Sequence, residues 1–523
     1  MTRRTRDEPP TPTSKMTSQM TSKKTPKAGA NPAVALATST GAPIAVVHAT
    51  AELAPFARTG GLGEAVRTLA QYQAQAGIDV TIVMPYYGDV ARQAPAVTPL
   101  GPPLRVPVGG RVEEVTLLEL GRPVGPPSPR VIFVASPTYF GRDGIYGDPQ
   151  GEFRDNARRY ACFSRAVIEA LPRITNGAVV VHAHDWHAAL VPVYLRGLLA
   201  HDVQYGRVAS VLSVHNAGFQ GHFPTATMAD LGVPWSLYTL HHLEWYGRMN
   251  FLKGGISFAD AVMTVSPTHA NELRTEGGGF GLHDAFRELD GRFVGIVNGI
   301  DQDEWDPTTD SQLAARYSRD DLAGKAACKA SLQRLFGLPR RARTPLVAMS
   351  ARMVYQKGLD LIFGSGFLTL DAQFVFLGAG EARYERALLD LARRAPDRLG
   401  VQLHFTDRLE HRLLAGADFC LMPSMYEPCG LTQMRAQRYG TLPLARRVGG
   451  LADTIEDGVT GFLFDDYTSD DFLQGTARAV RAYREPATFA RMQREAMSRD
   501  FGWEHAESRY RDVYRFAAAR RGA

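Results

Sequence analysis

Short apolar runs alternate with longer amphipathic segments from residue 44 onward. Residues 44–48 form an apolar run typical of a buried strand, and a glycine-rich turn follows at 59–63. Residues 64–76 have the apolar spacing of a helix, and residues 79–84 form the next apolar run. A buried strand, a glycine turn, a helix and a second buried strand make the βαβ unit of a parallel sheet. The first elements therefore predict an α/β fold.

The same alternation continues along the chain in two consecutive series. The first series has further strands expected at 131–135, 178–182 and 208–214. The second has strands expected at 345–350, 373–377, 401–405, 418–422, 442–444 and 461–464. A final helix at 504–520 has aromatic residues on one face. The pattern predicts two parallel α/β halves, with ligand sites just beyond the carboxyl ends of the strands.

Composition and charge single out the N-terminal segment. The first 40 residues hold seven Lys or Arg and two acidic residues, and the rest of the chain holds 52 of each sign. The net charge of +5 therefore belongs to this segment and gives little support to nucleic-acid binding by the folded part. Its Thr, Ser, Lys and Pro content predicts disorder. A transit peptide has a similar composition, but the acidic residues and prolines at 7–10 argue against one.

Cysteine content and hydropathy exclude further classes of protein. The chain has four cysteines and no CxxC motif, so we expect reduced thiols and neither a disulfide framework nor a zinc site. No stretch approaches 18 uninterrupted apolar residues, so no membrane span is expected. The N-terminal segment has no apolar core of the kind found in secretion signals. These observations predict a cytoplasmic protein.

Three loops after predicted strands are suited to anions. The first contains Arg58 and a pair of glycines at 60–61, whose N–H groups can approach an anion closely, although it does not match the dinucleotide or P-loop patterns. The second contains Arg352 and Lys357, two cations that suit a diphosphate. The third, residues 424–433, opens a helix with free N–H groups. Plain βα turns and solvated cations are the alternative interpretations.

Histidines gather after two other predicted strands. His182, His184, Asp185 and His187 belong to the sequence HAHDWH, and a His-Asn pair at 215–216 ends the next strand. Alternate residues of a strand share a face, so His182 and His184 are expected to point the same way. This suggests a metal site, but no further ligands of a zinc geometry stand out. The alternative is a strand end whose polar residues bond to local backbone.

Together these motifs resemble those of bacterial glycogen synthases and plant starch synthases. The segments TGGL, HAHDWH, VHN, FLKGG, TVSPTHA, VNGIDQDEWDP, QKGLDL, EPCGLTQ, YGTLPL and GGLADT occur in the family's order between residues 44 and 514. Members of this family are retaining glycosyltransferases of the GT-B type. The resemblance implies two Rossmann-like domains facing each other across a cleft, with the C-terminal helix returning to the first domain.

The pattern and the resemblance together give expected domain limits. We expect a disordered basic tail at 1–40, followed by an N-terminal Rossmann-like catalytic domain on the acceptor side at 41–297. Residues 298–343 are expected to form an interdomain linker and the start of the second domain. A C-terminal Rossmann-like domain on the nucleotide-sugar side is expected at 344–495, and a helix packing back on the N-terminal domain at 496–523.

The resemblance also implies roles for individual residues. The expected catalytic residues are Asp185, His215, Glu427, Arg352 and Lys357. The expected substrate-binding residues are Arg58, Gly60, Gly61, His187, Asn216, Asn298, Phe405, Cys429, Gly430, Leu431 and Thr432. Arg352 and Lys357 match the pair that holds the diphosphate. Glu427 matches the carboxylate that binds glucose hydroxyls, and Phe405 stands where relatives often stack an aromatic ring on adenine.

The implied reaction transfers glucose, with retention, from ADP-glucose to the 4-hydroxyl at the non-reducing end of an α-1,4-glucan such as glycogen. Negative charge grows on the leaving diphosphate in the transition state, so preorganised cations and N–H donors lower the barrier. Two cationic side chains serve this purpose, so no metal and no cofactor are expected. Nucleic acid and membrane are not expected as partners.

Several alternatives remain at this point. A related enzyme that uses UDP-glucose or another acceptor would carry the same phosphate motifs. An α-glucan phosphorylase would need a lysine-bound pyridoxal phosphate, and no segment resembles that site. An inactive glucan-binding protein is disfavoured by the retained site residues. Departures from the family pattern are Arg58 for Lys, Glu64 for Asp, Ala51 for Ser, and Arg435 where related families place a second Glu.

Overall fold

The computed structural model describes residues 36–93, 96–122 and 125–522. Residues 1–35 of the expected tail lie outside this description. At the start of the described chain, Leu36 is buried and Ala37 forms an antiparallel bridge with Pro43. In the ranges given above, no helix is both long enough and apolar enough to cross a membrane.

The first half of the chain builds a ten-stranded mixed sheet in the order β15-β14-β10-β9-β1-β2-β6-β5-β3, with β4 paired to β5. Its parallel strands are β1 (Ile44–Ala49), β2 (Val80–Pro85), β6 (Arg130–Ala135), β9 (Ala178–His184), β10 (Ala209–Val214), β14 (Ala261–Thr264) and β15 (Phe293–Gly295). Antiparallel strands extend one edge: β3 (Val97–Pro99), β4 (Leu104–Val108) and β5 (Arg111–Leu120).

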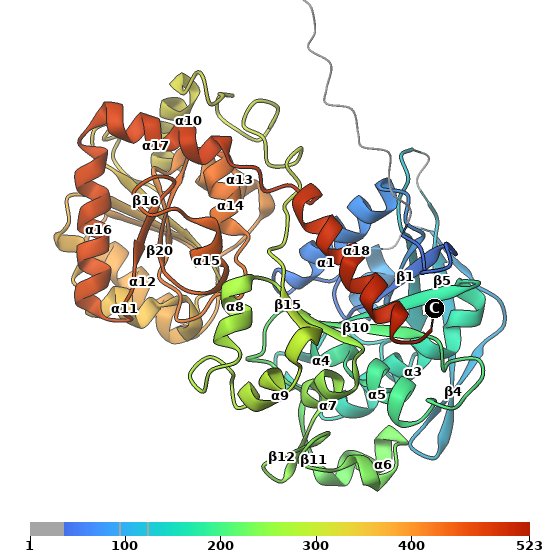
Figure 1. The fold of residues 1–523 in the computed structure, drawn as a ribbon. Coiled ribbons are helices and arrows are strands. Elements are labelled where there is room, and N and C mark those ends of the chain that lie inside the picture. Colours follow the sequence, from blue (N-terminus) through green and yellow to red (C-terminus); the bar gives the residue numbers. More distant parts are fainter. Residues whose placement is uncertain (1–35, 94–95, 123–124, 523) are drawn as a thin grey trace, which may run out of the picture. The chain divides into compact units, whose positions relative to one another are not determined.

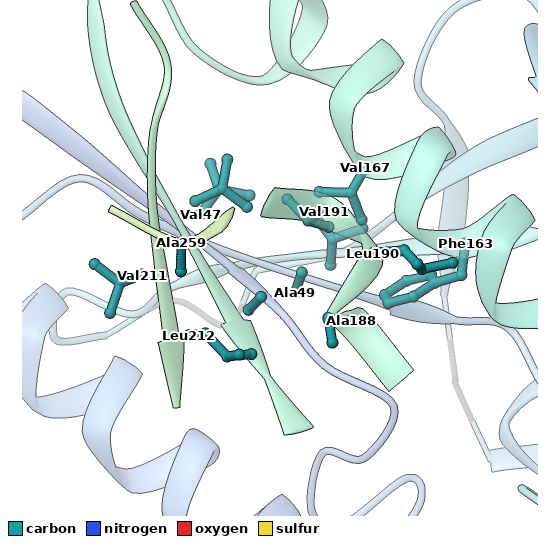
Figure 2. Close-up of a cluster of buried hydrophobic side chains, with 14 of the residues drawn as sticks. Val47, Ala49, Phe163, Val167, Ala188, Leu190, Val191, Val211, Leu212 and Ala259 are labelled. Carbon is teal, nitrogen blue, oxygen red and sulfur yellow. The ribbon is translucent and has the colours of Figure 1, made fainter. Parts of the chain in front are cut away.

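Helices cover the central strands of this sheet, among them α1 (Leu62–Gln75), α3 (Asn156–Ile174), α5 (Leu190–Gly197) and α7 (Phe251–Phe258). Every residue of β1, β2 and β10 is buried, which is expected of parallel strands covered on both faces. Figure 2 shows part of the core, where Val47 and Ala49 of β1 belong to the same apolar cluster as Val167 of α3 and Leu190 of α5. Each fully buried Val or Leu side chain contributes about 1.5–3 kcal/mol.

The second half builds an all-parallel six-stranded sheet in the order β18-β17-β16-β19-β20-β21. Its strands are β16 (Leu346–Ser350), β17 (Gln373–Leu377), β18 (Leu399–Gln402), β19 (Phe419–Met422), β20 (Leu442–Arg446) and β21 (Phe462–Phe464). The longer helices of this half are α10 (Ala323–Leu335), α12 (Ala382–Arg394), α13 (Asp407–Gly416), α16 (Ser469–Tyr483) and α17 (Pro486–Ser498). The two consecutive parallel α/β halves expected from the sequence are therefore present.

The last helix, α18 (Glu504–Ala519), returns to the first sheet, where it packs on β9, β10 and β14 (Figure 1). Its aromatic face is buried as expected, because Tyr510 and Tyr514 are 3% and 0% exposed. The segment that leads back to the first sheet contacts the segment that leaves it, because the Ile300 N–H donates to the Phe501 carbonyl at 2.9 Å. Gly299 is needed here because a Cβ atom would come within 2.7 Å of the Trp503 ring.

One expected strand ends earlier than predicted. The prediction was residues 401–405, whereas β18 ends at Gln402. His404, Phe405 and Thr406 are exposed, and the Thr406 hydroxyl accepts a hydrogen bond from the Leu409 N–H to cap α13. The predicted strand extended into the following loop because Phe405 is an apolar residue, although its side chain is 42% exposed.

Candidate functional site

Asp185 lies where β9 ends and the short helix α4 (Asp185–Ala188) begins. Its backbone has a φ of 54°, a left-handed conformation that is uncommon outside glycine. Its Oδ1 accepts hydrogen bonds from the backbone N–H groups of His215 at 2.7 Å and Asn216 at 3.3 Å. Burial raises the pKa of the Asp185 carboxyl to about 7, against the lowering effect of these two N–H donors. Asp185 thus joins the ends of β9 and β10.

His182 and His184 of this edge are buried, His215 is half-buried, and all three are neutral at pH 7. Burial lowers the pKa of His215 to about 4 and that of His182 and His184 well below the usual value. His182 and His184 point the same way, as expected, with ring centroids 4.2 Å apart. Nitrogens of His48, His182 and His184 approach one another within 4.8 Å. Every one of these nitrogens already has a hydrogen-bond partner, so the cluster is explained as a hydrogen-bonded network.

His187 and Asn216 flank Asp185 in different surroundings. The His187 ring is 5% exposed and stacks on Tyr146 with centroids 4.5 Å apart. Its Nδ1 is buried and has no partner within the described residues. Asn216 is half-buried, and its Oδ1 accepts from the Gly218 N–H at 2.9 Å.

Lys357 and Glu427 form an ion pair at the end of the second sheet. Lys357 closes the turn Tyr355–Lys357 after β16, and its Nζ lies 2.6 Å from Glu427 Oε2. The Ser424 hydroxyl donates to the same carboxylate oxygen at 2.9 Å. Arg352 is exposed and has no ion-pair partner in the part of the chain that the structure describes. The edge therefore presents one paired and one unpaired cation.

The turn after Glu427 brings three more expected residues together. Cys429 is buried, Gly430 has a φ of 68°, and Leu431 precedes α14 (Thr432–Arg438). The N–H groups of Gly430 and Leu431 have no hydrogen-bond partner among the described residues. Asn298 is 6% exposed and its buried Oδ1 likewise lacks a partner there.

The glycine loop at 58–61 lies before α1 and meets the second half of the chain. A Cβ atom on Gly61 would lie 3.7 Å from Leu431 Cδ1. Arg58 pairs with Asp407 at 2.7 Å, and its guanidinium lies 5.9 Å from the centre of the Phe405 ring. Arg58 and Phe405 are therefore neighbours.

Further contacts join the two halves through three of the family motifs. The Ser266 hydroxyl donates to the Pro428 carbonyl at 2.6 Å. The Thr268 hydroxyl and N–H both donate to the Asp453 carboxylate, at 2.7 and 2.9 Å. The TVSPTHA, EPCGLTQ and GGLADT segments are therefore in contact.

Two departures from the family pattern also meet. The Arg435 guanidinium lies 3.7 Å from Glu64 and 3.4 Å from Glu410. It also lies 4.3 Å from the centre of the Trp305 ring. Arg435 thus occupies an ionic and aromatic contact rather than an open position.

Sequence reasoning missed Glu52. This carboxylate is 3% exposed and accepts hydrogen bonds from the Thr59 N–H at 2.8 Å, the Thr59 hydroxyl at 2.6 Å and the Tyr146 hydroxyl at 2.6 Å. It fixes the start of the glycine loop. An available signal was its place just past the carboxyl end of β1, the position that suggested the other site residues.

Known protein families match both halves of the chain. Residues 45–288 match the family model "Starch synthase catalytic domain", and residues 335–496 match "Glycosyl transferases group 1". The chain is 42% identical to a glycogen synthase of Anaeromyxobacter sp. over 91% of this chain and 99% of that one. It is 39% identical to glycogen synthase 2 of Geobacter sulfurreducens over 91% of this chain and 100% of that one.

A solved structure gives the same result. The catalytic domain of starch synthase IV from Arabidopsis thaliana, bound to ADP and acarbose, superposes with a TM-score of 0.82 at 31% identity, covering 91% of this chain and 99% of that chain. The GT-B fold expected from the sequence is thereby confirmed. The chain belongs to the glycogen and starch synthase family of glycosyltransferases.

Proposed function

We propose that this glycogen synthase transfers glucose from ADP-glucose to the 4-hydroxyl at the non-reducing end of an α-1,4-glucan, with retention at C1. The observation that supports it most is the Lys357–Glu427 pair, with Nζ and Oε2 2.6 Å apart at the end of the second sheet. A cation and a carboxylate in contact suit the two ends of the bond to be broken, the diphosphate and the glucose. The ADP in the Arabidopsis relative supports the choice of donor.

In this proposal the second lobe, residues 344–495, holds the nucleotide sugar. Lys357, Arg352 and the N–H groups of Gly430–Thr432 stabilise the charge that grows on the leaving diphosphate. When the donor binds, the diphosphate replaces Glu427 as the ion-pair partner of Lys357. Glu427 then accepts hydrogen bonds from glucose hydroxyls. Arg58, with Gly60 and Gly61, approaches the same phosphates from the first lobe.

The first lobe, residues 41–297, holds the transferred glucose and the acceptor. Asp185 and His215 orient the glucose ring, with Asn216 and His187 beside them. Asn298 and Cys429 line the connection between the lobes, and Phe405 lies beside the nucleotide base. Because water would compete with the glucan hydroxyl, closure of the lobes about residues 298–307 excludes it from the donor.

The test is incorporation of radiolabelled glucose into glycogen from ADP-glucose and, in parallel, from UDP-glucose. We expect incorporation from ADP-glucose at a kcat/KM at least tenfold above that from UDP-glucose. The labelled product should be released by an enzyme specific for α-1,4 bonds. Incorporation from neither donor would refute the transferase, and preference for UDP-glucose would refute the donor alone.

A further inference from the structure

A row of hydrogen-bonded side chains runs from α1 and α18 to His215. Gln73 Oε1 lies 2.8 Å from His48 Nε2, and His48 Nδ1 lies 2.9 Å from His184 Nε2. His184 Nδ1 in turn lies 2.9 Å from His215 Nε2. Gln73 and His48 are both 0% exposed and His184 is 1% exposed, so water does not interrupt the row.

The neutral state of the histidines makes the row directional. Burial lowers the pKa of His48 and His215 to about 4, and that of His184 well below its usual value. At neutral pH each ring therefore carries a single N–H. In each N···N contact, one nitrogen must carry a hydrogen and the other must accept it. Once the protonated nitrogen is set in the ring at one end of the row, the tautomer of every other ring in the row follows.

Gln73 sets that end. Its amide oxygen faces His48, so His48 donates from Nε2 and accepts at Nδ1. His184 then donates from Nε2 and accepts at Nδ1, and His215 donates from Nε2. His215 Nδ1 is left with a free lone pair and has no partner among the described residues. A rotated Gln73 amide would reverse every ring and present an N–H at this atom instead.

Tyr514 of α18 bonds to the other polar atom of the Gln73 amide. Gln73 Nε2 donates to the Tyr514 hydroxyl at 2.9 Å, and this hydroxyl lies 2.9 Å from His182 Nδ1. His182 Nε2 is bonded to the Ser213 hydroxyl at 2.7 Å. The Gln73 amide thus bonds through its oxygen to His48 of the first sheet and through its nitrogen to Tyr514 of the C-terminal helix.

We propose that Gln73 and Tyr514 are positioning residues for glucosyl transfer, which hold His215 as the Nε2–H tautomer with its Nδ1 lone pair facing a hydroxyl of the transferred glucose. The role of that lone pair rests on the proposed function, whereas the tautomer does not. The geometry assigns His215 as an acceptor of a hydrogen bond from the sugar, so it neither donates a proton nor carries charge toward the leaving diphosphate.

The direct test is the tautomer of His215 in the ligand-free full chain. Long-range ¹H–¹⁵N correlation of ¹⁵N-histidine-labelled protein at pH 7.5 distinguishes Nε2–H, Nδ1–H and doubly protonated rings. His215 is identified among the 14 histidines by the signal that disappears in His215→Gln. We expect the Nε2–H form, and an Nδ1–H or doubly protonated ring would overturn the proposal whether or not the protein transfers glucose.

The second test removes the residue that sets the direction. Gln73→Met keeps the length of the side chain and removes both polar atoms, so we expect mixed His215 tautomers and a kcat lower by roughly tenfold, about the value of one hydrogen bond, with KM changed less than twofold. Gln71→Met, on the same helix and outside the row, is the matched control and should match the wild type. Tyr514→Phe keeps the Gln73–His48 bond and should give a smaller change of the same kind. An unchanged His215 signal and kcat in Gln73→Met would refute the positioning role.

Discussion

The parallel strands of the two sheets end in chemically different edges, although both edges are expected to face one substrate. The first ends in Asp185 and His215, where the imidazole is neutral and burial raises the pKa of the carboxyl to about 7. The second ends in the Lys357–Glu427 ion pair beside the exposed Arg352. The first edge therefore combines a neutral imidazole with a carboxyl that is partly protonated near pH 7, whereas the second carries an ion pair and an exposed cation.

This difference follows from what each edge is proposed to hold. A glucose ring is neutral and is recognised by hydrogen bonds, so buried neutral rings suffice. A diphosphate is an anion, and its charge grows as the bond to C1 breaks, so full cations are needed next to it. Burying a charge without a partner is costly, and Glu427 acts as the partner of Lys357 in the absence of substrate.

Removing the cation Lys357 from the second edge should have the largest effect on activity. Lys357→Ala is expected to lower kcat/KM by about 10³-fold, because the leaving diphosphate loses a preorganised charge and Glu427 loses its partner. The measurement is the glycogen incorporation assay. Arg393→Ala, which removes an exposed cation from α12, is the control and should keep full activity. A Lys357→Ala enzyme with more than a tenth of the wild-type activity and an unchanged melting temperature would contradict the phosphate role.

The neutral edge can be tested through the pH dependence of stability. The Asp185 pKa is raised to about 7 in the fold, above its usual 3.8. A raised carboxyl pKa stabilises the fold fully below about pH 4, and this contribution is lost as the pH rises toward 7. Asp185→Asn removes the titration and keeps an acceptor for the His215 N–H.

The melting temperature of Asp185→Asn relative to wild type should therefore be higher at pH 8 than at pH 5, by on the order of 2 °C. Thermal scans of both proteins in the same buffers measure it. The exposed Asp284→Asn is the control, since it should show no such difference. A relative melting temperature that falls between pH 5 and pH 8 would mean that Asp185 is not held with a raised pKa.

The smallest effect is expected where the two edges meet through Arg58. Its pair with Asp407 is exposed, with side-chain exposures of 39% and 57%, and such pairs contribute little. Arg58→Lys restores the family's usual residue and keeps the charge, so kcat/KM for ADP-glucose should change by less than about threefold. Steady-state kinetics decide this, and a loss beyond tenfold would show that the longer Arg side chain has a specific contact of its own.

Much of the fold could be predicted because parallel strands are continuous apolar runs. The runs at 44–48, 79–84 and 373–377 correspond to β1, β2 and β17 within one or two residues. The run at 401–405 was extended too far, because an exposed Phe405 next to a helix cap has the same letters as a core phenylalanine. Sequence alone does not tell a core aromatic from one exposed at a loop.

The sequence indicated that the candidate site residues follow the ends of strands. It did not indicate the hydrogen-bonded network that links the histidines. His182, His184 and Asp185 are adjacent in sequence, and the two-residue repeat of a strand puts both histidines on one face. The other members of the network are His48, Gln73 and Tyr514, and the hydrogen-bonded pair Gln73–Tyr514 is 441 residues apart along the chain. The metal interpretation of HAHDWH arose because those partners, which take up the ring nitrogens, lay outside the motif.

The return of α18 to the first sheet also sets an order of events during synthesis. The strands β9, β10 and β14 are made early, but the helix that covers them and supplies Tyr514 is made after the whole of the second lobe. A chain cut immediately before α18 would keep Arg352 and Lys357 and lose the Tyr514 hydroxyl that bonds to the Gln73 amide. The helix that completes the first lobe is therefore synthesised last, so the edge that we propose faces the sugar is completed after the edge that we propose faces the diphosphate.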